Sequence, residues 1–341
     1  MPIEQTEHHE DRELLEPHTL DELCEHFNLG SLIENRPLTG GRMNQVTCLT
    51  TTKGRYVLKQ YTERLQYKKE EHLARIVLEA QFLDFLKQKG FQCGSVYSPE
   101  VFVFEGKHSL IYDFVEGKPL EKNDTNLLRL AKQTALFHQL SSEYQVPKGL
   151  STEETIDDDL IKSSLQAIGL APEKIESLLG RMAQLNIEQS GLRAPDKRLP
   201  EFLIHGDLNP ENILTAGEDL NFIDFESLNL TSPLREIARI IELWCLDKEK
   251  RIQMGKVNSF LAEYEKYRPL QKMERELLSF YFEFEMFARL VRRSITCLGI
   301  MDPNNGAFSY AKKTVKKIDL FQEDRAKFEE ALNPDRGNEK K

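Results

Sequence analysis

Residues 202–226, FLIHGDLNPENILTAGEDLNFIDFE, constrain the possible folds of this chain more than any other segment. Three short apolar runs, Phe202–Ile204, Ile213–Leu214 and Leu220–Ile223, are separated by polar residues. Short runs of this kind, bounded by turn residues, are typical of strands whose loops carry polar side chains. The segment is therefore predicted to be a compact β-rich unit, and the long helical patterns that follow it predict a mainly helical remainder.

Strand patterns dominate the first third of the chain and helical patterns dominate the rest. Before Gly117 the sequence predicts strands at Asn44–Thr51, Arg55–Gln60, Glu100–Phe104 and Ser109–Phe114, and a helix over residues 69–89. After Gly117 it predicts a helix from Asn123 or Asp124, two modest helices within residues 141–200, and longer ones near 233–247, 254–267, 269–298 and 309–331. Strands and helices in separate stretches predict an α+β fold.

The change of character near Gly117 is also the predicted domain boundary. We expect an N-terminal domain over residues 17–116 and a C-terminal domain over residues 117–332. Residues 1–16 and 333–341 are polar and lack an apolar period, so both ends are predicted to be mobile. The first segment also lacks the apolar centre of a signal peptide.

Charge and cysteine content limit the classes of protein to which this chain can belong. The chain has 341 residues, with 46 Lys and Arg against 56 Asp and Glu, so its net charge is −10 and nucleic acid is not an expected partner. No apolar run approaches the roughly 20 residues that a membrane-spanning helix needs. The five cysteines are widely spaced and form no C-x-x-C pair, so neither a disulfide framework nor a zinc ribbon is expected. A cytoplasmic protein without a membrane partner is predicted.

The polar residues of the 202–226 segment have the composition that phosphoryl transfer requires. Asp207 follows His205 and Gly206, Asn212 lies five positions later, and Asp224 twelve positions after Asn212. Transfer from ATP needs a carboxylate that accepts the hydroxyl proton and oxygen ligands for Mg²⁺. Asp207 is accordingly the predicted base, and Asn212 and Asp224 are the predicted metal ligands.

HGDLNPEN followed by IDFE resembles the H-G-D-x-x-x-x-N…D-[FW]-[DE] signature of the superfamily of aminoglycoside phosphotransferases, choline kinases and homoserine kinases. The resemblance extends from about Leu38 to Glu236. It implies a bilobal protein-kinase-like fold, with a small β-rich N-terminal lobe and a larger, mainly helical C-terminal lobe. It also implies ATP and Mg as cofactors and a small-molecule alcohol as the acceptor.

By the same resemblance, several upstream residues bind the nucleotide. Lys59 in YVLKQY is similar to the lysine that holds the α- and β-phosphates, and Glu79 to the carboxylate that pairs with it. LIYDFVEG is similar to the hinge, where Asp113 would offer its carbonyl and Val115 its N–H to adenine. The remaining positions belong to the loop that covers the phosphates: Gly40, Gly41 and Asn44.

Two acidic residues leave alternatives open. Glu226 either contacts a second metal or supports the first from outside its ligand set. Glu236 stands where the family often has a supporting Asp, so it either takes that role with a longer side chain or the support is missing. A small-molecule kinase is favoured over a protein Ser/Thr kinase of the same fold. A nucleotide-binding scaffold is disfavoured because it would not need all the polar residues of phosphoryl transfer.

The acceptor is the least constrained part of the prediction. The helix predicted over 269–298 is apolar on two sides, so Glu283 and Glu285 on its flanks need partners. Either both pair with arginines such as Arg289 or Arg292, or one of them binds a cationic amine of the acceptor. The second interpretation predicts an amine-bearing alcohol. The identity of the acceptor, the choice between ATP and GTP, and the oligomeric state are not readable from the sequence.

Overall fold

The computed structural model describes residues 17–38, 44–62, 69–147, 157–192, 199–300 and 306–332. It divides into two compact units. Unit 1 comprises Met1–Gly117 and Asn221–Glu226, and unit 2 comprises Lys118–Leu220 and Ser227–Lys341. The ends at 1–16 and 333–341, which were predicted to be mobile, lie outside the described residues.

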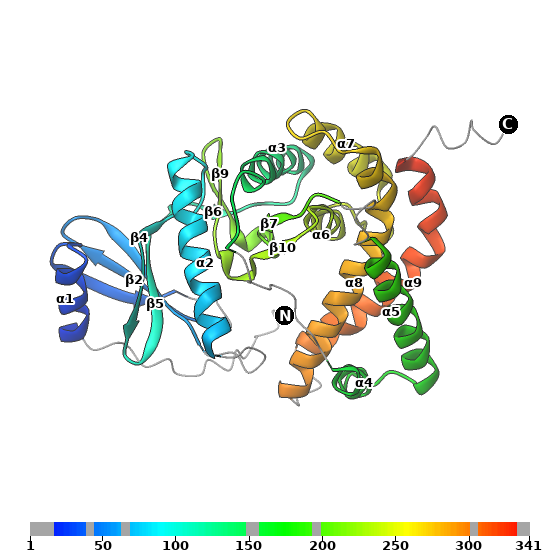
Figure 1. Cartoon of the computed structure of the whole chain (residues 1–341), viewed down its shortest axis with the longest axis horizontal. Coiled ribbons are helices and arrows are strands. Elements are labelled where there is room, and N and C mark those ends of the chain that lie inside the picture. The colour runs from blue at the N-terminus through cyan, green and yellow to red at the C-terminus, as the bar shows by residue number, and fades with distance from the viewer. Residues whose placement is uncertain are drawn as a thin grey trace, which may run out of the picture. The chain divides into compact units, whose positions relative to one another are not determined.

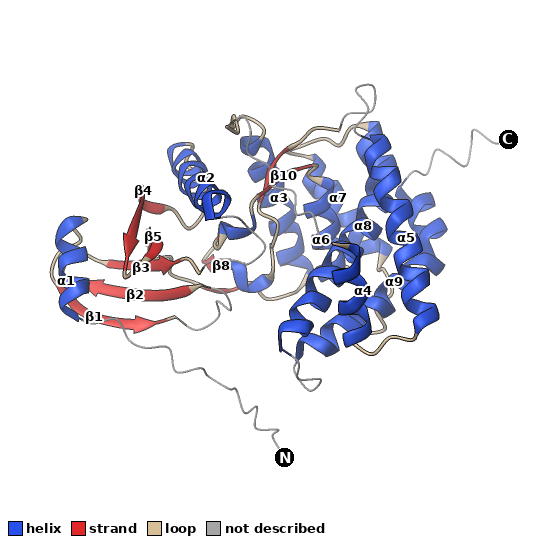
Figure 2. Cartoon of the chain, turned by 60° about the horizontal axis from the view of Figure 1, so that its bottom comes forward, coloured by secondary structure: helices blue, strands red, loops and turns tan. Residues whose placement is uncertain are grey.

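Unit 1 is built on an antiparallel five-stranded sheet with two helices (Figure 1). The strand order is β1-β2-β3-β5-β4. In chain order its elements are α1 (Pro17–His26), β1 (Leu32–Pro37), β2 (Gln45–Thr51), β3 (Arg55–Gln60), α2 (Lys69–Gln88), β4 (Val96–Phe104) and β5 (Lys107–Asp113). Leu20, Leu23 and Phe27 of α1 share a buried core with Leu49, Leu58 and Ile111 of the sheet. α2 packs along β4, as Figure 2 shows.

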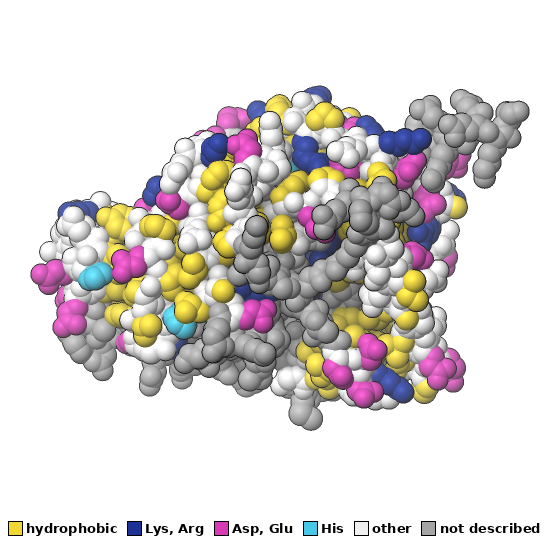
Figure 3. All heavy atoms as spheres, in the orientation of Figure 1, with side chains coloured by type: hydrophobic (Ala, Val, Ile, Leu, Met, Phe, Trp, Pro, Cys, Tyr) yellow, Lys and Arg dark blue, Asp and Glu magenta, His cyan; other side chains and the backbone are white. Residues whose placement is uncertain are grey.

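β4 begins four residues earlier than the sequence predicts. Pro99 lies in the added part of the strand, and proline cannot donate to a sheet ladder. The structure continues β4 back to Val96 and shifts its register against β5 between Ser98 and Phe102, so the proline lies within the irregular stretch. β4 and β1 are the edge strands, and each carries an exposed apolar side chain, Val103 and Ile33. Hydrophobic side chains also gather over the unit 1 sheet on the face shown in Figure 3.

Unit 2 is mainly helical, with short strands near the predicted motif. Its elements before the motif are β6 (Lys118–Pro119), α3 (Asp124–Ser141), α4 (Asp158–Ala167) and α5 (Pro172–Leu192). The motif segment forms β7 (Phe202–Ile204), the 3-10 helix η2 (Pro210–Asn212), β8 (Ile213–Ala216), β9 (Asp219–Phe222), the 3-10 helix η3 (Phe225–Ser227) and β10 (Asn229–Thr231). Then follow α6 (Leu234–Trp244), α7 (Met254–Glu265), α8 (Lys272–Ile300) and α9 (Gly306–Leu332).

α8 is the central helix of unit 2. It contacts α4, α5, α6 and α9 (Figure 1). The apolar stripe of Leu278, Phe282 and Met286 is buried, and the main stripe is buried or partly buried along its length. The α+β class predicted from the sequence is therefore observed, with strands concentrated in unit 1 and helices in unit 2. Among the described helices, none combines the length and apolar character needed to cross a membrane.

Candidate active site

Lys59 lies at the centre of a buried ion cluster in unit 1. β3 carries it between β2 and β5, and the residue is 6% exposed. Its Nζ donates to Asp224 Oδ1 at 2.7 Å and lies 3.6 Å from both Glu79 Oε1 and Glu226 Oε2. One cation is thus surrounded by three carboxylates, and the predicted proximity of Lys59 and Glu79 is observed.

The charges of this cluster shift the pKa values of its members. Burial alone lowers the pKa of Lys59, but the carboxylates of Glu79, Asp224 and Glu226 together raise it well above its ordinary value. Burial raises the pKa of Glu79 more than the charge of Lys59 lowers it. Lys59 therefore stays charged, and the three carboxylates that it contacts outnumber it.

Tyrosines hold Glu79 in place. The Tyr112 hydroxyl, on β5, donates to Glu79 Oε1 at 2.7 Å, and the Tyr61 and Tyr112 hydroxyls are 2.7 Å apart. The Lys59 ammonium also lies 5.0 Å from the ring centre of Tyr61. No sequence motif pointed to these tyrosines, because their contacts depend on strand register.

Asp224 has an unusual backbone conformation. Its φ is 64°, in the left-handed region that non-glycine residues rarely adopt and that is often found at functional sites. The Asn44 side chain donates to the neighbouring Glu226 and accepts the backbone N–H of Thr62 at 3.1 Å. Asn44, predicted to bind the nucleotide, is thus placed beside the Lys59 cluster and anchors Glu226.

The predicted hinge residues follow β5. The Asp113 carboxylate accepts Lys87 Nζ at 3.0 Å and the Ser95 hydroxyl at 2.7 Å. Both contacts are made by Oδ2, so the carboxylate is held toward Lys87 and Ser95. Val115 lies in the segment after β5 that forms neither helix nor strand. Gly40 and Gly41 lie outside the described residues.

The loop after β7 in unit 2 is fixed by Glu236 of α6. The Glu236 carboxylate accepts the backbone N–H groups of His205, at 3.3 Å, and of Gly206, at 2.8 Å. Gly206 has a φ of 80°, and a Cβ there would lie 2.2 Å from the Ser227 carbonyl oxygen, so only glycine fits. Of the two alternatives for Glu236, the structure supports the one in which it stabilises the motif loop.

Glu236 is itself held by a buried histidine. His138 Nε2 lies 2.9 Å from Glu236 Oε2, and its Nδ1 lies 2.7 Å from the Tyr264 hydroxyl. Burial lowers the pKa of His138 more than Glu236 raises it, so the ring is neutral at pH 7. A neutral ring that donates from Nε2 to the carboxylate accepts from Tyr264 at Nδ1. This chain of contacts connects α3, α6 and α7 to the motif loop.

Asp207 projects from this loop with its side chain 35% exposed. Its carboxylate oxygen Oδ1 lies 3.9 Å from an Arg239 nitrogen and 4.0 Å from an Arg289 nitrogen. The Asn212 amide nitrogen donates to the Asp207 carbonyl at 2.9 Å, which turns the amide oxygen of Asn212 away from the loop. The two residues predicted as base and ligand are thus joined within unit 2.

Arginines around Asp207 are the main feature that the sequence did not predict. Arg239 donates to Glu242 at 2.7 Å and to Asn209 at 2.5 Å. Glu242 also pairs with Lys317 at 2.6 Å. α6 places Arg235, Arg239 and Glu242 at spacings of four and three on a buried helix, and charges in such a helix are the only sequence signal for this cluster.

Glu283 and Glu285 are both paired with arginines, as the first of the two interpretations predicted. Glu285 contacts Arg235 at 3.0 Å, Arg292 at 3.1 Å and Arg289 at 3.9 Å. Glu283 is fully buried, and its partners come from other helices: Arg181 of α5 and Arg325 of α9, at 2.6 and 2.7 Å. These pairings give no support to the binding of an amine by either glutamate.

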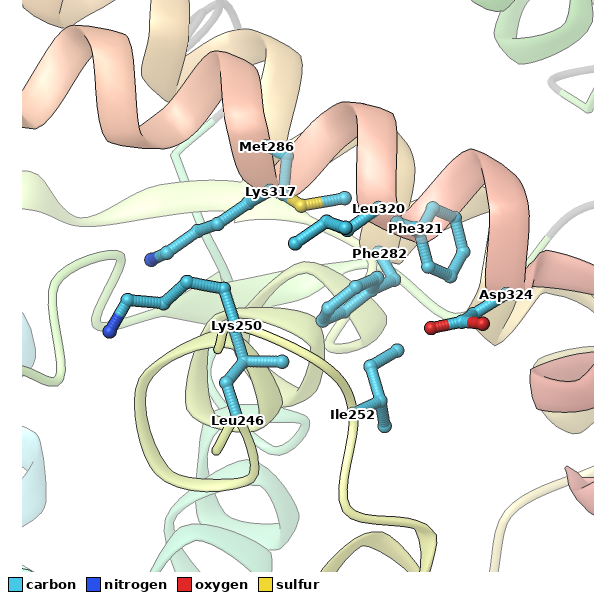
Figure 4. A pocket seen from close by; sticks show the side chains of 9 residues that line it. All are labelled: Leu246, Lys250, Ile252, Phe282, Met286, Lys317, Leu320, Phe321 and Asp324. Atoms are coloured by element: carbon cyan, nitrogen blue, oxygen red, sulfur yellow. The ribbon is translucent and has the colours of Figure 1, made fainter. Parts of the chain in front are cut away.

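Two small pockets adjoin the helices of unit 2. One lies against the motif loop and is lined by Gly206, Ser227, Arg235, Arg239 and Arg292, among others. The other, shown in Figure 4, has an apolar floor of Phe282, Met286 and Phe321, with Lys250 and Lys317 at one side and Asp324 at the other. Within the described part of the chain, no three His, Cys, Asp or Glu side chains are grouped as metal ligands.

Comparisons with known proteins identify the family of this chain. Residues 34–270 match the phosphotransferase enzyme family, APH. The homoserine kinase of Mesorhizobium japonicum is 23% identical over 269 residues, covering 76% of this chain and 79% of that protein.

Solved structures show the same fold at low identity. A microcompartment-associated aminopropanol kinase superposes with a TM-score of 0.65 at 16% identity, over 91% of this chain and 98% of its own. The choline kinase of Cryptosporidium parvum gives a TM-score of 0.61 at 15% identity, over 93% and 99% of the two chains. The predicted protein-kinase-like fold is thereby confirmed.

Proposed function

This chain belongs to the phosphotransferase enzyme family, and we propose that it transfers the γ-phosphate of ATP to an amine-bearing alcohol, with Asp207 as the base. Membership makes it an ATP-dependent kinase of a small-molecule alcohol. The observation that carries the proposal is Asp207 itself. Its carboxylate is about one third exposed, although its loop is anchored by the buried Glu236.

The proposed reaction needs little covalent participation by the protein. The acceptor hydroxyl donates its proton to the Asp207 carboxylate while its oxygen bonds to the γ-phosphorus. The bond from that phosphorus to the bridging oxygen breaks, and ADP leaves with the electron pair. A base fixed by hydrogen bonds contributes by position as well as by proton transfer.

Unit 1 supplies the proposed nucleotide-binding groups. Lys59, held by Glu79, binds the α- and β-phosphates, and the backbone of Asp113 and Val115 meets adenine. The proposal assigns the N-terminal domain, residues 17–116, to the nucleotide and the C-terminal domain, residues 117–332, to catalysis and the acceptor. Its support is the buried Lys59–Glu79 pair, at 3.6 Å, and the fixed Asp113 side chain.

Asn212 and Asp224 fit the ligand chemistry of Mg²⁺. An amide oxygen and a carboxylate are hard oxygen donors, and Mg²⁺ uses few protein ligands beside phosphate oxygens and waters. The Asn212 nitrogen is engaged by the Asp207 carbonyl, so its oxygen is the atom left for a cation. Asn212 and Asp224 would hold Mg²⁺, which would supply positive charge against the negative charge that develops during transfer.

The amine on the acceptor is supported by the relatives alone. The proteins most similar to this chain include kinases named for homoserine, aminopropanol and choline, and each of these alcohols carries an amine or ammonium group. Glu283 and Glu285 are not used in this proposal, since both pair with arginines.

Asp207→Asn tests the proposal. A positioned base contributes about 10²–10⁴-fold, so turnover should fall by that factor while ADP binding stays unchanged. Asp219→Asn, on the exposed first residue of β9, is the matched control and should retain full turnover. Near-normal turnover of Asp207→Asn would contradict the assignment. Turnover stimulated by proteins and by no small alcohol would favour a protein kinase, and no turnover with any acceptor would favour a scaffold.

A further inference from the structure

Positive charge exceeds negative charge around Asp207 in unit 2. The ion pairs of Asp207, Glu242 and Glu285 involve five cations in the described part of the chain. These are Arg235, Arg239, Arg289, Arg292 and Lys317. Three carboxylates cannot neutralise five cations. Glu236 adds a fourth negative charge nearby, which still leaves the cations in excess; its oxygens accept the N–H groups of the motif loop and His138.

Glu242 and Glu285 each have two cationic partners other than Arg289, so neither carboxylate depends on Arg289 for its ion pair. Glu242 is already held by Arg239 and Lys317, at 2.7 and 2.6 Å. Glu285 is already held by Arg235 and Arg292, at 3.0 and 3.1 Å. Arg289 Nε lies 3.3 Å from Glu242 Oε2 but without hydrogen-bond geometry, and a terminal nitrogen of Arg289 lies 3.9 Å from Glu285.

Arg239 is also a buried guanidinium with a nitrogen that makes no hydrogen bond. Its side chain is 4% exposed, and its Nε also lacks a hydrogen-bond acceptor. Burying a guanidinium without full compensation is costly, because water no longer solvates it. Burial and the charge of Arg239 accordingly lower the pKa of Arg289 to about 10. A folded protein that keeps two such groups beside an exposed carboxylate has a binding site for negative charge.

We propose that the acceptor alcohol carries an oxyanion, a carboxylate or a phosphate, which binds Arg289 and Arg239 while its hydroxyl meets Asp207. The inference rests on the proposed function, since it identifies the ligand of the same site. A guanidinium presents paired donors that match the two oxygens of a carboxylate or phosphate. An amino acid with a hydroxyl group combines this oxyanion with the amine proposed above.

The shared chemistry, an oxyanion beside two arginines, has a second possible source. The γ-phosphate of the nucleotide is also an oxyanion, and arginines stabilise it in other phosphotransferases. The two sources predict different dependences. An acceptor oxyanion makes Arg289 important for acceptors that carry the charge, whereas a γ-phosphate makes it equally important for every acceptor.

The test compares acceptors with and without an oxyanion. L-Homoserine, L-serine and glycerate are paired with their amides, in which an uncharged group replaces the carboxylate, and glycerol 3-phosphate with glycerol, in turnover assays and by calorimetric binding. The member with the oxyanion is called charged and the other neutral. We expect the wild-type protein to prefer the charged member. Arg289→Gln should weaken affinity for it by about 10- to 150-fold, the factor for one charge-assisted hydrogen bond, and leave the neutral member unchanged.

Two further variants guard the interpretation. Arg289→Lys keeps the charge but loses the paired donors, so it should show an intermediate loss. Arg325→Gln on α9 removes an arginine from another buried glutamate, Glu283, which retains Arg181. It should bind all acceptors as the wild type does. Circular dichroism before each assay shows that the variants are folded.

Each outcome has one meaning. An equal loss with charged and neutral acceptors, together with a raised KM for ATP, would assign the arginines to the γ-phosphate and overturn the inference. Preference for neutral acceptors would overturn it as well. Absence of phosphoryl transfer would refute the proposed function. If a hydroxy acid still bound the wild type and not Arg289→Gln in calorimetry, the anion site would stand without that function.

Discussion

The two units each hold a buried ion cluster, and the clusters have opposite charge. In unit 1 a single cation, Lys59, is in contact with three carboxylates. In unit 2 five cations pair with three carboxylates around Asp207. A cluster with surplus negative charge is completed by a cation, and one with surplus positive charge by an anion.

The contrast suggests how one protein separates its two ligands. The unit 1 cluster suits a nucleotide that arrives with Mg²⁺, because the metal brings the missing positive charge. The unit 2 cluster suits a ligand that brings negative charge of its own. The pKa values follow the same division: the surrounding carboxylates raise that of Lys59, although burial lowers it, while burial and Arg239 lower that of Arg289. The loss of a carboxylate from the unit 2 cluster should therefore be compensated by an added anion, and the loss of Lys59 from the unit 1 cluster by an added cation.

Glu242→Gln should have the largest effect on stability. The carboxylate contacts Arg239, Lys317 and Arg289, and these cations hold its pKa well below the ordinary value even though burial raises it. The neutral amide leaves them uncompensated, so we expect a loss of about 3–5 kcal/mol in the free energy of unfolding. Urea denaturation measures it, and sulfate should restore part of the loss.

A surface pair provides the control for this variant. Glu323 contacts Arg251 at 2.7 Å, but its side chain is 61% exposed, so Glu323→Gln should cost no more than about 1 kcal/mol. Equal losses for the two variants would mean that the unit 2 cluster is not short of negative charge. Sulfate that stabilises the wild type as much as Glu242→Gln would argue the same.

Lys59→Met should have the next largest effect, and an added cation, rather than an added anion, should compensate for it. The change removes the ammonium that contacts Glu79, Asp224 and Glu226. Turnover should fall by about 10²–10³-fold, as when one preorganised donor to a reacting phosphate or oxyanion is lost. Because three carboxylates then face one another, MgCl₂ should raise the melting temperature of this variant more than that of the wild type.

Lys107→Met is the matched control on the neighbouring strand β5. Its ammonium binds Gln45 at the surface, so its loss should change neither turnover nor the response to MgCl₂. If Lys59→Met kept its turnover, the phosphate-binding role carried over from the family would be wrong. If MgCl₂ stabilised it no more than the wild type, the surplus of negative charge in unit 1 would be in doubt.

The sequence predicted the residues whose role depends on local spacing. His205, Asp207 and Asn212 lie within one loop, and the β3 strand pattern placed Lys59 correctly inside a sheet. Helices could also be predicted from the sequence, since the apolar residues of α8 recur with helical spacing in two stripes. The predicted strand at Glu100 omitted residues 96–99 of β4, where the register against β5 is irregular.

Residues that meet across the fold could not be predicted in this way. Arg239 and Arg289 reach Asp207 from α6 and α8, and nothing in the motif indicates which arginines on those helices face it. Tyr112 and His138 stabilise Glu79 and Glu236 through single hydrogen bonds between distant elements. Such contacts depend on helix packing and strand register, so only the structure identifies them.

The smallest expected effect concerns His138, a neutral buried group in unit 2. Its ring faces Glu236 and Tyr264, with Arg268 and Glu274 nearby, and burial lowers its pKa in the fold below the ordinary 6.5. Below pH 6.5 the unfolded chain therefore binds a proton that the folded chain does not. Stability from this residue is present above pH 6.5 and is lost as the pH falls, by at most about 1.4 kcal/mol per pH unit.

Two measurements check this prediction. NMR titration of the His138 ring should give a midpoint below 6.5, and urea denaturation should show a shallower fall in stability between pH 7 and 5 for His138→Gln than for the wild type. His26, on α1 of unit 1, gives the matched variant, and His26→Gln should keep the wild-type slope. A midpoint above 6.5 would mean that Glu236 holds an imidazolium. The motif loop would then be anchored by an ion pair like those of the charged clusters.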